Sequence, residues 1–206
     1  MKVLLVDDHS VVRSGLRVLL TSVADVEVLE AANGRDALAR LRQDRPDLVL
    51  LDLNLPGIGG LELLRRMLAE NSALRVLVLS MHTEPLYVAR AMKLGAHGYL
   101  SKNASAEELL TAVRRVAAGG HHIENDIAQE LALRAVSPGN DDLNDLSERD
   151  IEIMRLLAEG FGLAEIADTL GIGYKTAANA CSAIKTKLGV TRTNDLVRLA
   201  MTLGIA

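Results

Sequence analysis

The chain has 206 residues, of which 49% are hydrophobic and 24% are charged, and its formal net charge is −4. This length accommodates two domains, and the aliphatic content is sufficient for packed cores without added cross-links. The single cysteine, Cys181, excludes an internal disulfide and fits a reducing compartment. No run approaches the roughly 20 apolar residues of a membrane span, and the N-terminal apolar run is too short for a signal peptide. We therefore expect a soluble, cytoplasmic protein with no membrane partner.

Residues 1–120 alternate short apolar runs with longer amphipathic segments. Runs with the length and the Val and Leu content of strands lie at 2–6, 26–31, 47–52, 74–80 and 97–101. Helical spacing of the apolar residues predicts helices over 10–22, 34–43, 60–70, 84–94 and 105–118. The third and fourth strands are almost continuously apolar, which is typical of strands buried on both faces. This alternation predicts an α/β domain with a five-stranded parallel sheet covered by helices on both sides. For such a doubly wound sheet we expect the order 2-1-3-4-5, which is the known order of flavodoxin-like sheets.

The pattern changes after Gly120. One further helix is expected over 123–135, and "SPGNDD" at 137–142 indicates a linker. The remaining sequence contains no strand-like run and predicts short helices over 147–158, 163–169, 174–188 and 192–203. We therefore expect a first domain over 1–120, a linker with a helix over 121–142, and a smaller all-helical domain over 143–206.

Polar side chains stand where the strands of the first domain end. Asp7 and Asp8 follow the first strand and Asp52 follows the third, so their carboxylates are expected to converge where open α/β sheets bind ligands. Crowded carboxylates are unfavourable without a cation, and such hard oxygen ligands suit Mg²⁺. Ser80 ends the fourth strand and Lys102 follows the fifth, and both can donate to a phosphoryl oxygen. These residue types together describe a site that forms an aspartyl phosphate.

Four segments of the first domain resemble the receiver domain of two-component response regulators of the NarL/FixJ type. They are "VLLVDDHSVVRSGL", "DLVLLDLNLPGIGGLELL", "VLVLSMH" and "GAHGYLSKNASAEELLTAVRRVAAG". The resemblance implies a flavodoxin-like fold in which a sensor histidine kinase phosphorylates Asp52. It also implies a Mg²⁺ site formed by Asp7, Asp8, Asp52 and the backbone carbonyl of Asn54. In this family Ser80 and Lys102 would contact the phosphoryl group, and Tyr99 would turn inward when Ser80 moves toward it.

The second domain resembles the LuxR-type helix-turn-helix through "LSERDIEIMRLLAEG", "AEIADTLGI" and "KLGV". In a helix-turn-helix the second helix enters the major groove of double-stranded DNA. Here that helix is 174–188, and its spacing turns Ala177, Cys181, Ile184 and Leu188 inward. The residues expected to contact DNA are Lys175, Thr176, Asn179, Ser182, Lys185 and Lys187.

The acidic net charge does not oppose DNA binding, because the acidic residues are concentrated elsewhere. Residues 171–206 contain five basic residues and one acidic residue, whereas 141–170 contain nine acidic residues and two basic ones. Since exposed charges are screened over about 10 Å at 0.1 M salt, the local field decides what the helix attracts.

These patterns predict a non-enzymatic response regulator. Phosphorylation of Asp52 is expected to control sequence-specific DNA binding and transcription, with a homodimer formed on phosphorylation or on DNA binding. Alanines at 177, 178 and 180 stand where the family usually has bulk or polarity, so a helical domain that acts through protein–protein contacts is one alternative. An aspartyl-phosphate hydrolase of the haloacid dehalogenase type is another. Such enzymes usually carry a second aspartate two residues after the first, and Asn54 at that position argues against turnover.

Overall fold

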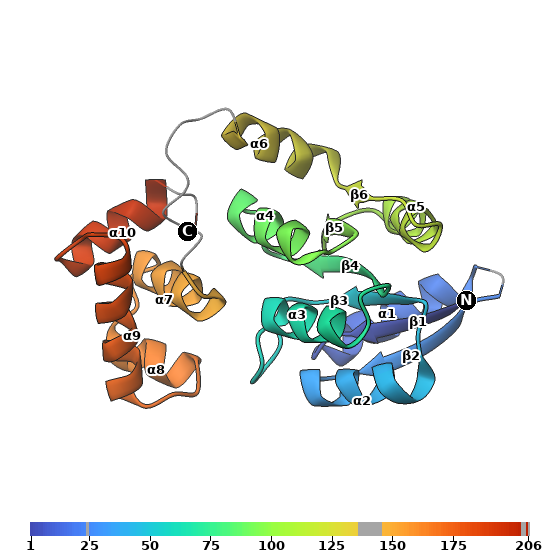
Figure 1. The fold of residues 1–206 in the computed structure, drawn as a ribbon, viewed down its shortest axis with the longest axis horizontal. Coiled ribbons are helices and arrows are strands. Elements are labelled where there is room, and N and C mark those ends of the chain that lie inside the picture. The colour runs from blue at the N-terminus through green and yellow to red at the C-terminus, as the bar shows by residue number, and fades with distance from the viewer. Residues whose placement is uncertain (24, 136–145, 203–204, 206) are drawn as a thin grey trace. The chain divides into compact units, whose positions relative to one another are not determined.

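The computed structural model describes residues 1–23, 25–135, 146–202 and 205 (Figure 1). The chain forms two compact units, Met1–Ala132 and Leu133–Ala206. Within the described ranges, every helix is too short or too polar to cross a membrane. The helix before the expected linker is described, whereas the linker signal at 137–142 lies outside the described residues.

The first unit is built on a parallel sheet. Its strands are β1 (Lys2–Val6), β2 (Glu27–Ala31), β3 (Leu48–Leu51), β4 (Arg75–Ser80), β5 (Gly98–Ser101) and β6 (His122–Ile123). The strands lie in the order β2-β1-β3-β4-β5-β6 and all pairs are parallel. This confirms the predicted class of fold and the order of the first five strands.

The predicted number of strands is wrong, because β6 extends the sheet beyond β5. The amide of His122 donates to the carbonyl oxygen of His97 at 3.1 Å, and the amide of Glu124 donates to that of Tyr99 at 3.2 Å. These bonds satisfy an edge that would otherwise be unpaired. With only two residues, β6 offers no alternation of apolar and polar side chains from which a strand can be predicted.

Helices cover both faces of this sheet (Figure 1). They are α1 (Ser10–Thr21), α2 (Gly34–Asp44), α3 (Gly60–Glu70), α4 (Pro85–Leu94) and α5 (Ala106–Ala117), whereas α6 (Asn125–Ala135) follows β6. On one face, Leu20 of α1 and Val113 of α5 pack in a core cluster with Val3 and Leu5 of β1. Because successive strand residues point to opposite faces, Leu4 and Val6 of β1 face the other layer of helices, where both are buried. Each strand is thus held from both sides, which fixes where its carboxyl end lies.

Two helix starts in the first unit are capped by side chains, at α2 and α5. Asn33 accepts a hydrogen bond from the amide of Asp36 at 3.0 Å at the start of α2, and Ser105 accepts one from Glu108 at 3.1 Å at the start of α5. Pro85 stands in the first turn of α4, where a missing N–H costs nothing. These local signals agree with the predicted helices.

The second unit is helical, with α7 (Glu148–Ala158), α8 (Leu163–Thr169), α9 (Tyr174–Lys187) and α10 (Thr193–Thr202). Ser147 and Asp150 form a reciprocal capping box at the start of α7, with bonds of 3.1 and 2.8 Å. Gly171, in the turn between α8 and α9, has a φ of 62°, a conformation that favours glycine. The four helices bury a common core of Ile151, Ile153, Met154, Ile166, Ala177, Cys181, Ile184, Leu196 and Ala200.

Candidate functional site

The acidic pocket is formed at the carboxyl ends of β1 and β3. The register pairs Val6 with Leu51, so the residues that follow, Asp7 and Asp52, leave the sheet side by side. The amide of Asp52 donates to the carbonyl oxygen of Val6 at 2.9 Å and continues the ladder by one step. Both carboxylates are 2% exposed, whereas Asp8 is exposed. The topology therefore brings the predicted aspartates together at one edge of the sheet.

Lys102 bridges the two buried carboxylates, and its single positive charge offsets one of their two negative charges. Its Nζ lies 2.7 Å from Oδ2 of Asp7 and 2.7 Å from Oδ2 of Asp52. Burial by itself would lower the pKa of Lys102, but the hydrogen bonds that its ammonium group donates to the two carboxylates outweigh this effect and raise the pKa above its usual value. The backbone amide of Lys102 donates to the carbonyl oxygen of Ser80 at 2.9 Å, which fixes the lysine beside the end of β4. The ammonium group is therefore charged at neutral pH and held at the carboxylates.

Ser80 and Tyr99 lie buried next to the pocket and share one neighbour, His82. The Ser80 hydroxyl accepts a hydrogen bond from the His82 amide at 3.1 Å, and the Tyr99 hydroxyl donates to the His82 carbonyl at 2.5 Å. Tyr99 is fully buried, and burial raises the pKa of its phenol, so it remains a donor. The structure thus has Tyr99 turned inward and linked to Ser80 through one residue.

Asn54 lies against the pocket through both its backbone and its side chain. Its amide donates to Oδ1 of Asp52 at 3.0 Å, and its Oδ1 lies 2.9 Å from Nε2 of His82. The His82 ring stacks on Tyr87 with a centroid distance of 4.6 Å. The imidazole therefore lies beside the loop that follows Asp52, a position that sequence reasoning missed. His82 comes two residues after the end of a strand. Its residue type alone does not indicate that its ring contacts the Asn54 side chain.

His9 is the second residue that sequence reasoning missed. Ligand atoms of Asp7, Asp8, His9 and Asp52 all lie within 4.8 Å of one another. Three convergent carboxylates are the donor set that a hard divalent cation prefers, so the side chains present fit a Mg²⁺ site. The feature of the sequence that could have indicated His9 is its place directly after the aspartate pair.

The outer face of α9 presents the predicted polar residues. Lys175, Thr176, Asn179 and Ser182 are exposed, whereas Lys185 is half-buried. Lys187 is also exposed, but its Nζ forms an ion pair with Oδ2 of Asp150 at 2.6 Å. The Lys187–Asp150 pair ties the end of α9 to the start of α7. The face thus brings four of the expected residues together and gives Lys187 a contact within the domain.

The inner face of α9 follows the prediction, with one difference. Ala177, Cys181 and Ile184 are buried. Leu188 is half-buried and forms the C-cap, one residue beyond the end of the helix. Tyr174, at the start of α9, is 60% exposed, although no role was predicted for it.

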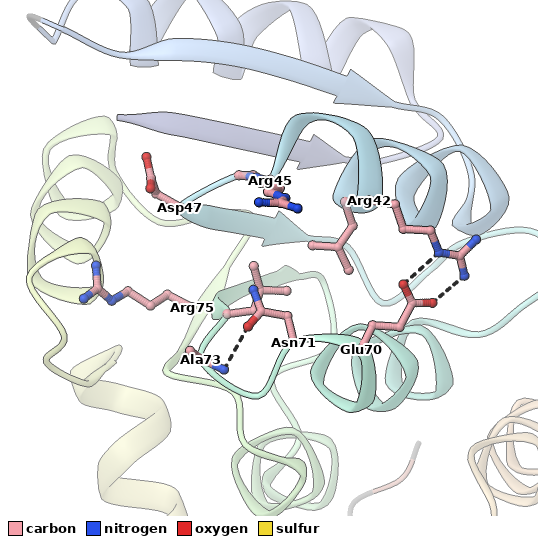
Figure 2. Close-up of a pocket in the computed structure, with 10 residues that line it drawn as sticks. Arg42, Arg45, Asp47, Glu70, Asn71, Ala73 and Arg75 are labelled. Atoms are coloured by element: carbon pink, nitrogen blue, oxygen red, sulfur yellow. Dashed lines mark hydrogen bonds and ion pairs between the residues drawn. The ribbon is translucent and has the colours of Figure 1, made fainter.

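A cavity of about 490 Å³ lies at the opposite edge of the sheet from the aspartates. Figure 2 shows its lining, which comes from the ends of α2 and α3 and the starts of β3 and β4. Arg42 and Glu70 pair across it through two contacts of 2.8 and 2.5 Å. Because the lining residues come from the amino ends of the strands, the cavity is separate from the acidic pocket.

A flavodoxin-like sheet with a lysine-bridged aspartate pocket, followed by a helix-turn-helix, defines a receiver protein with a DNA-binding domain. Residues 3–114 match the response regulator receiver domain, and residues 144–200 match the bacterial regulatory proteins of the luxR family. The chain belongs to the NarL/FixJ family of two-component response regulators and functions in the regulation of transcription.

Relatives match along almost the whole chain. The response regulator UvrY of Escherichia coli K12 is 37% identical over 98% of this chain and 94% of its own length. The transcriptional activator protein ExaE of Pseudomonas putida is 41% identical over 100% of this chain and 98% of its own. A structure of RcsB from Salmonella enterica serovar Typhimurium, bound to promoter rprA with the phosphomimetic BeF3⁻, is 26% identical with a TM-score of 0.66, covering 96% of each chain.

Proposed function

We propose that a sensor histidine kinase phosphorylates this response regulator on Asp52 and that the phosphoryl group controls DNA binding through α9. The observation that carries the proposal is the bridge from Lys102 Nζ to the carboxylates of Asp7 and Asp52, 2.7 Å from each. A buried carboxylate held between an ammonium group and a backbone amide is oriented for attack in one direction. Asp7 is held in the same way, by Lys102 and by the amide of His9, so the proposal of Asp52 as the acceptor rests on the resemblance to receiver domains.

In the transfer, one carboxylate oxygen of Asp52 forms a P–O bond as the P–N bond of a kinase phosphohistidine breaks. The imidazole leaves with the electron pair of that bond and takes up a proton. The transferred group gathers negative charge on its oxygens, and Lys102 and the Ser80 hydroxyl would donate to them. Asp7, Asp8, Asp52 and the backbone carbonyl of Asn54 would hold Mg²⁺, which would neutralise part of that charge.

The contacts of Ser80 supply a route from the pocket to the surface of the sheet. If Ser80 moves toward a phosphoryl oxygen, it pulls on the His82 amide with which it is hydrogen-bonded at 3.1 Å. The His82 carbonyl also holds the Tyr99 hydroxyl at 2.5 Å, so the same motion tightens the inward position of Tyr99. The proposed output is a change in the β4–β5 face that promotes a homodimer.

The exposed face of α9 supplies the proposed DNA contacts. Lys175, Thr176, Asn179 and Ser182 provide one cation and three hydrogen-bonding groups with no acidic side chain among them. Asn pairs well with adenine, and Lys and Ser bind bases or phosphates. Ala177 is fully buried, so it packs α9 and removes nothing from this face. A dimer of the chain would place two such helices on half-sites about one turn of DNA apart.

DNA selection with and without a small phosphodonor tests this proposal. Wild-type protein and the variant Asp52→Asn are incubated with random double-stranded fragments in Mg²⁺, and retained fragments are sequenced. We expect the phosphodonor to increase enrichment of a two-part site for the wild type and to have no effect on Asp52→Asn. Equal enrichment with and without the phosphodonor would mean that phosphorylation does not control DNA binding. No enriched sequence in either case would favour a helical domain that acts through protein contacts.

A further inference from the structure

Glu124 joins the end of β5 to the start of α6, and it stands in the chain between β6 and that helix (Figure 1). Its carboxylate Oε2 accepts a hydrogen bond from the backbone amide of Ser101 at 2.8 Å. Its own amide donates to the carbonyl oxygen of Tyr99 at 3.2 Å, and its carbonyl oxygen accepts from the amide of Ala128 in the first turn of α6 at 2.9 Å. One residue therefore ties three elements of the first unit together.

The carboxylate of Glu124 takes the place of a backbone acceptor in the sheet. The carbonyl oxygens of His97 and Tyr99 accept from β6 and its following residue, so alternate residues face that side and the amide of Ser101 is the next donor there. In a continued parallel ladder this amide would donate to the backbone carbonyl of Glu124, but α6 already uses that carbonyl. The side chain supplies the acceptor instead, and a bond to an ionised carboxylate is stronger than one between neutral groups.

Ser101 is held by hydrogen bonds at its amide, its hydroxyl and its carbonyl. The hydroxyl accepts from the amide of Asn103 at 3.1 Å, and the carbonyl oxygen accepts from the amide of Ala104 at 3.0 Å. Ser101 is buried, so its amide would be left unsatisfied if the Glu124 carboxylate were removed. Glu124 therefore completes the hydrogen bonding at the last residue of β5.

Lys102 follows Ser101 directly and is held from the opposite side. Its amide donates to the carbonyl oxygen of Ser80 on β4 at 2.9 Å, whereas the Ser101 amide donates to Glu124 on the side of β6. The backbone that carries the lysine is thus fixed from two sides. Because the ammonium group lies 2.7 Å from each of the two pocket carboxylates, a shift of this backbone would displace it from them.

We propose that Glu124 is a positioning residue for Lys102 and that it couples phosphorylation of Asp52 to the start of α6. The inference rests on the proposed function, since it assumes that Lys102 binds the phosphoryl group. It goes beyond that function because it names a residue outside the pocket, at the start of the helix that leads along the chain toward the second unit. The coupling is reciprocal: an ordered end of β5 favours the contact between Lys102 and the phosphoryl group, and that contact favours the bond between Ser101 and Glu124.

Matched variants separate this role from a general effect on α6. Glu124→Ala removes the acceptor, Glu124→Gln keeps an oxygen at the same position, and Glu130→Ala removes an exposed glutamate from the same helix. The full-length protein is incubated with Mg²⁺ and a small phosphodonor, and the rate of phosphorylation at Asp52 is followed by mass spectrometry. Hydrogen exchange of a peptide that covers the start of α6 is measured with and without the phosphodonor.

We expect phosphorylation to slow exchange at the start of α6 at least about twofold in the wild type and in Glu130→Ala. Phosphorylation of Glu124→Ala should be about three- to tenfold slower, because the ammonium group is less well positioned for the transfer. Exchange at the start of α6 in this variant should no longer respond to the phosphodonor. Glu124→Gln should stay within about twofold of the wild type in both measurements, because its amide oxygen can accept the same hydrogen bond.

Three results would overturn the inference and leave the proposed function standing. The first is a wild-type rate of phosphorylation in Glu124→Ala, even with faster exchange in α6, because the contact would then be structural alone. The second is a response of α6 to the phosphodonor that persists in Glu124→Ala. The third is an equal loss in Glu130→Ala, which would assign the effect to the charge of the helix. Wild-type protein that takes up no phosphoryl group on Asp52 would overturn the proposed function and the inference with it.

Discussion

Replacement of Lys102 by Met should show how strongly the pocket depends on its one bridging cation. The Lys102 side chain is 11% exposed, and those of Asp7 and Asp52 are 3% and 1% exposed. Without the ammonium group, two buried carboxylates lie next to each other without the counter-charge that bridges them. Breaking a buried ion pair in this way costs about 3–5 kcal/mol, because the remaining charge is left uncompensated.

Hydrogen exchange followed by mass spectrometry is the suitable assay. A loss of about 3 kcal/mol corresponds to roughly hundredfold faster exchange of amides that open only when the receiver unit unfolds. The strands β1 and β3 should show this acceleration in Lys102→Met without Mg²⁺. Peptides from α7 to α10 act as an internal reference, since the second unit is compact in itself. Millimolar Mg²⁺ should restore part of the protection, because it supplies the missing positive charge.

Two results would refute this reasoning. Unchanged protection of β1 and β3 in Lys102→Met would mean that the carboxylates are already neutral or hydrated in the folded protein. Faster exchange that Mg²⁺ leaves unaltered would mean that the lysine supports packing and that the pocket has no use for a cation. The conservative variant Lys102→Arg keeps the charge and should lose much less protection than Lys102→Met, which separates charge from shape.

Three further predictions concern other parts of the chain. Burial lowers the pKa of His97, so the unfolded chain binds more protons, and thermal stability should fall as pH decreases from about 6.5; His97→Gln should flatten this dependence. Gly60→Ala should slow phosphorylation and lower the melting temperature, because its Cβ would lie 2.3 Å from the backbone of the loop after Asp52. Gly15→Ala is the matched control: in the described chain its Cβ meets no heavy atom within 4 Å, so stability should rise by up to about 1 kcal/mol. Lys175→Ala should weaken DNA retention and reduce the salt slope by about one, whereas Lys187→Ala should mainly lower the stability of the helical unit.

The acidic pocket was predictable because the residue types at the strand ends and the parallel topology together indicate which side chains converge. Asp7, Asp52, Ser80 and Lys102 each follow or end a strand, and parallel strands bring those ends to one edge of the sheet. The alternation of strands and helices was sufficient to predict that edge. The inner face of α9 was predictable for the same kind of reason, since helical spacing alone places Ala177 inward.

Other features depend on contacts between distant residues. The partner of Lys187 is Asp150, 37 residues away, and spacing along one helix cannot indicate it. The same holds for His82, which meets Asn54 across 28 residues. The strand β6 has two residues and is formed by pairing with β5, which gives it no pattern of its own. In each case tertiary contacts, not local sequence, decide the outcome.

The proposed function depends most directly on the identity of the phosphorylated residue. The full-length protein is incubated with Mg²⁺ and a small phosphodonor, the acyl phosphate is trapped by borohydride reduction, and the modified residue is located by mass spectrometry. We predict a single modification at Asp52, absent in Asp52→Asn and strongly reduced in Lys102→Met. A modification at Asp7, Asp8 or any other residue, or one that persists in Asp52→Asn, would contradict the account.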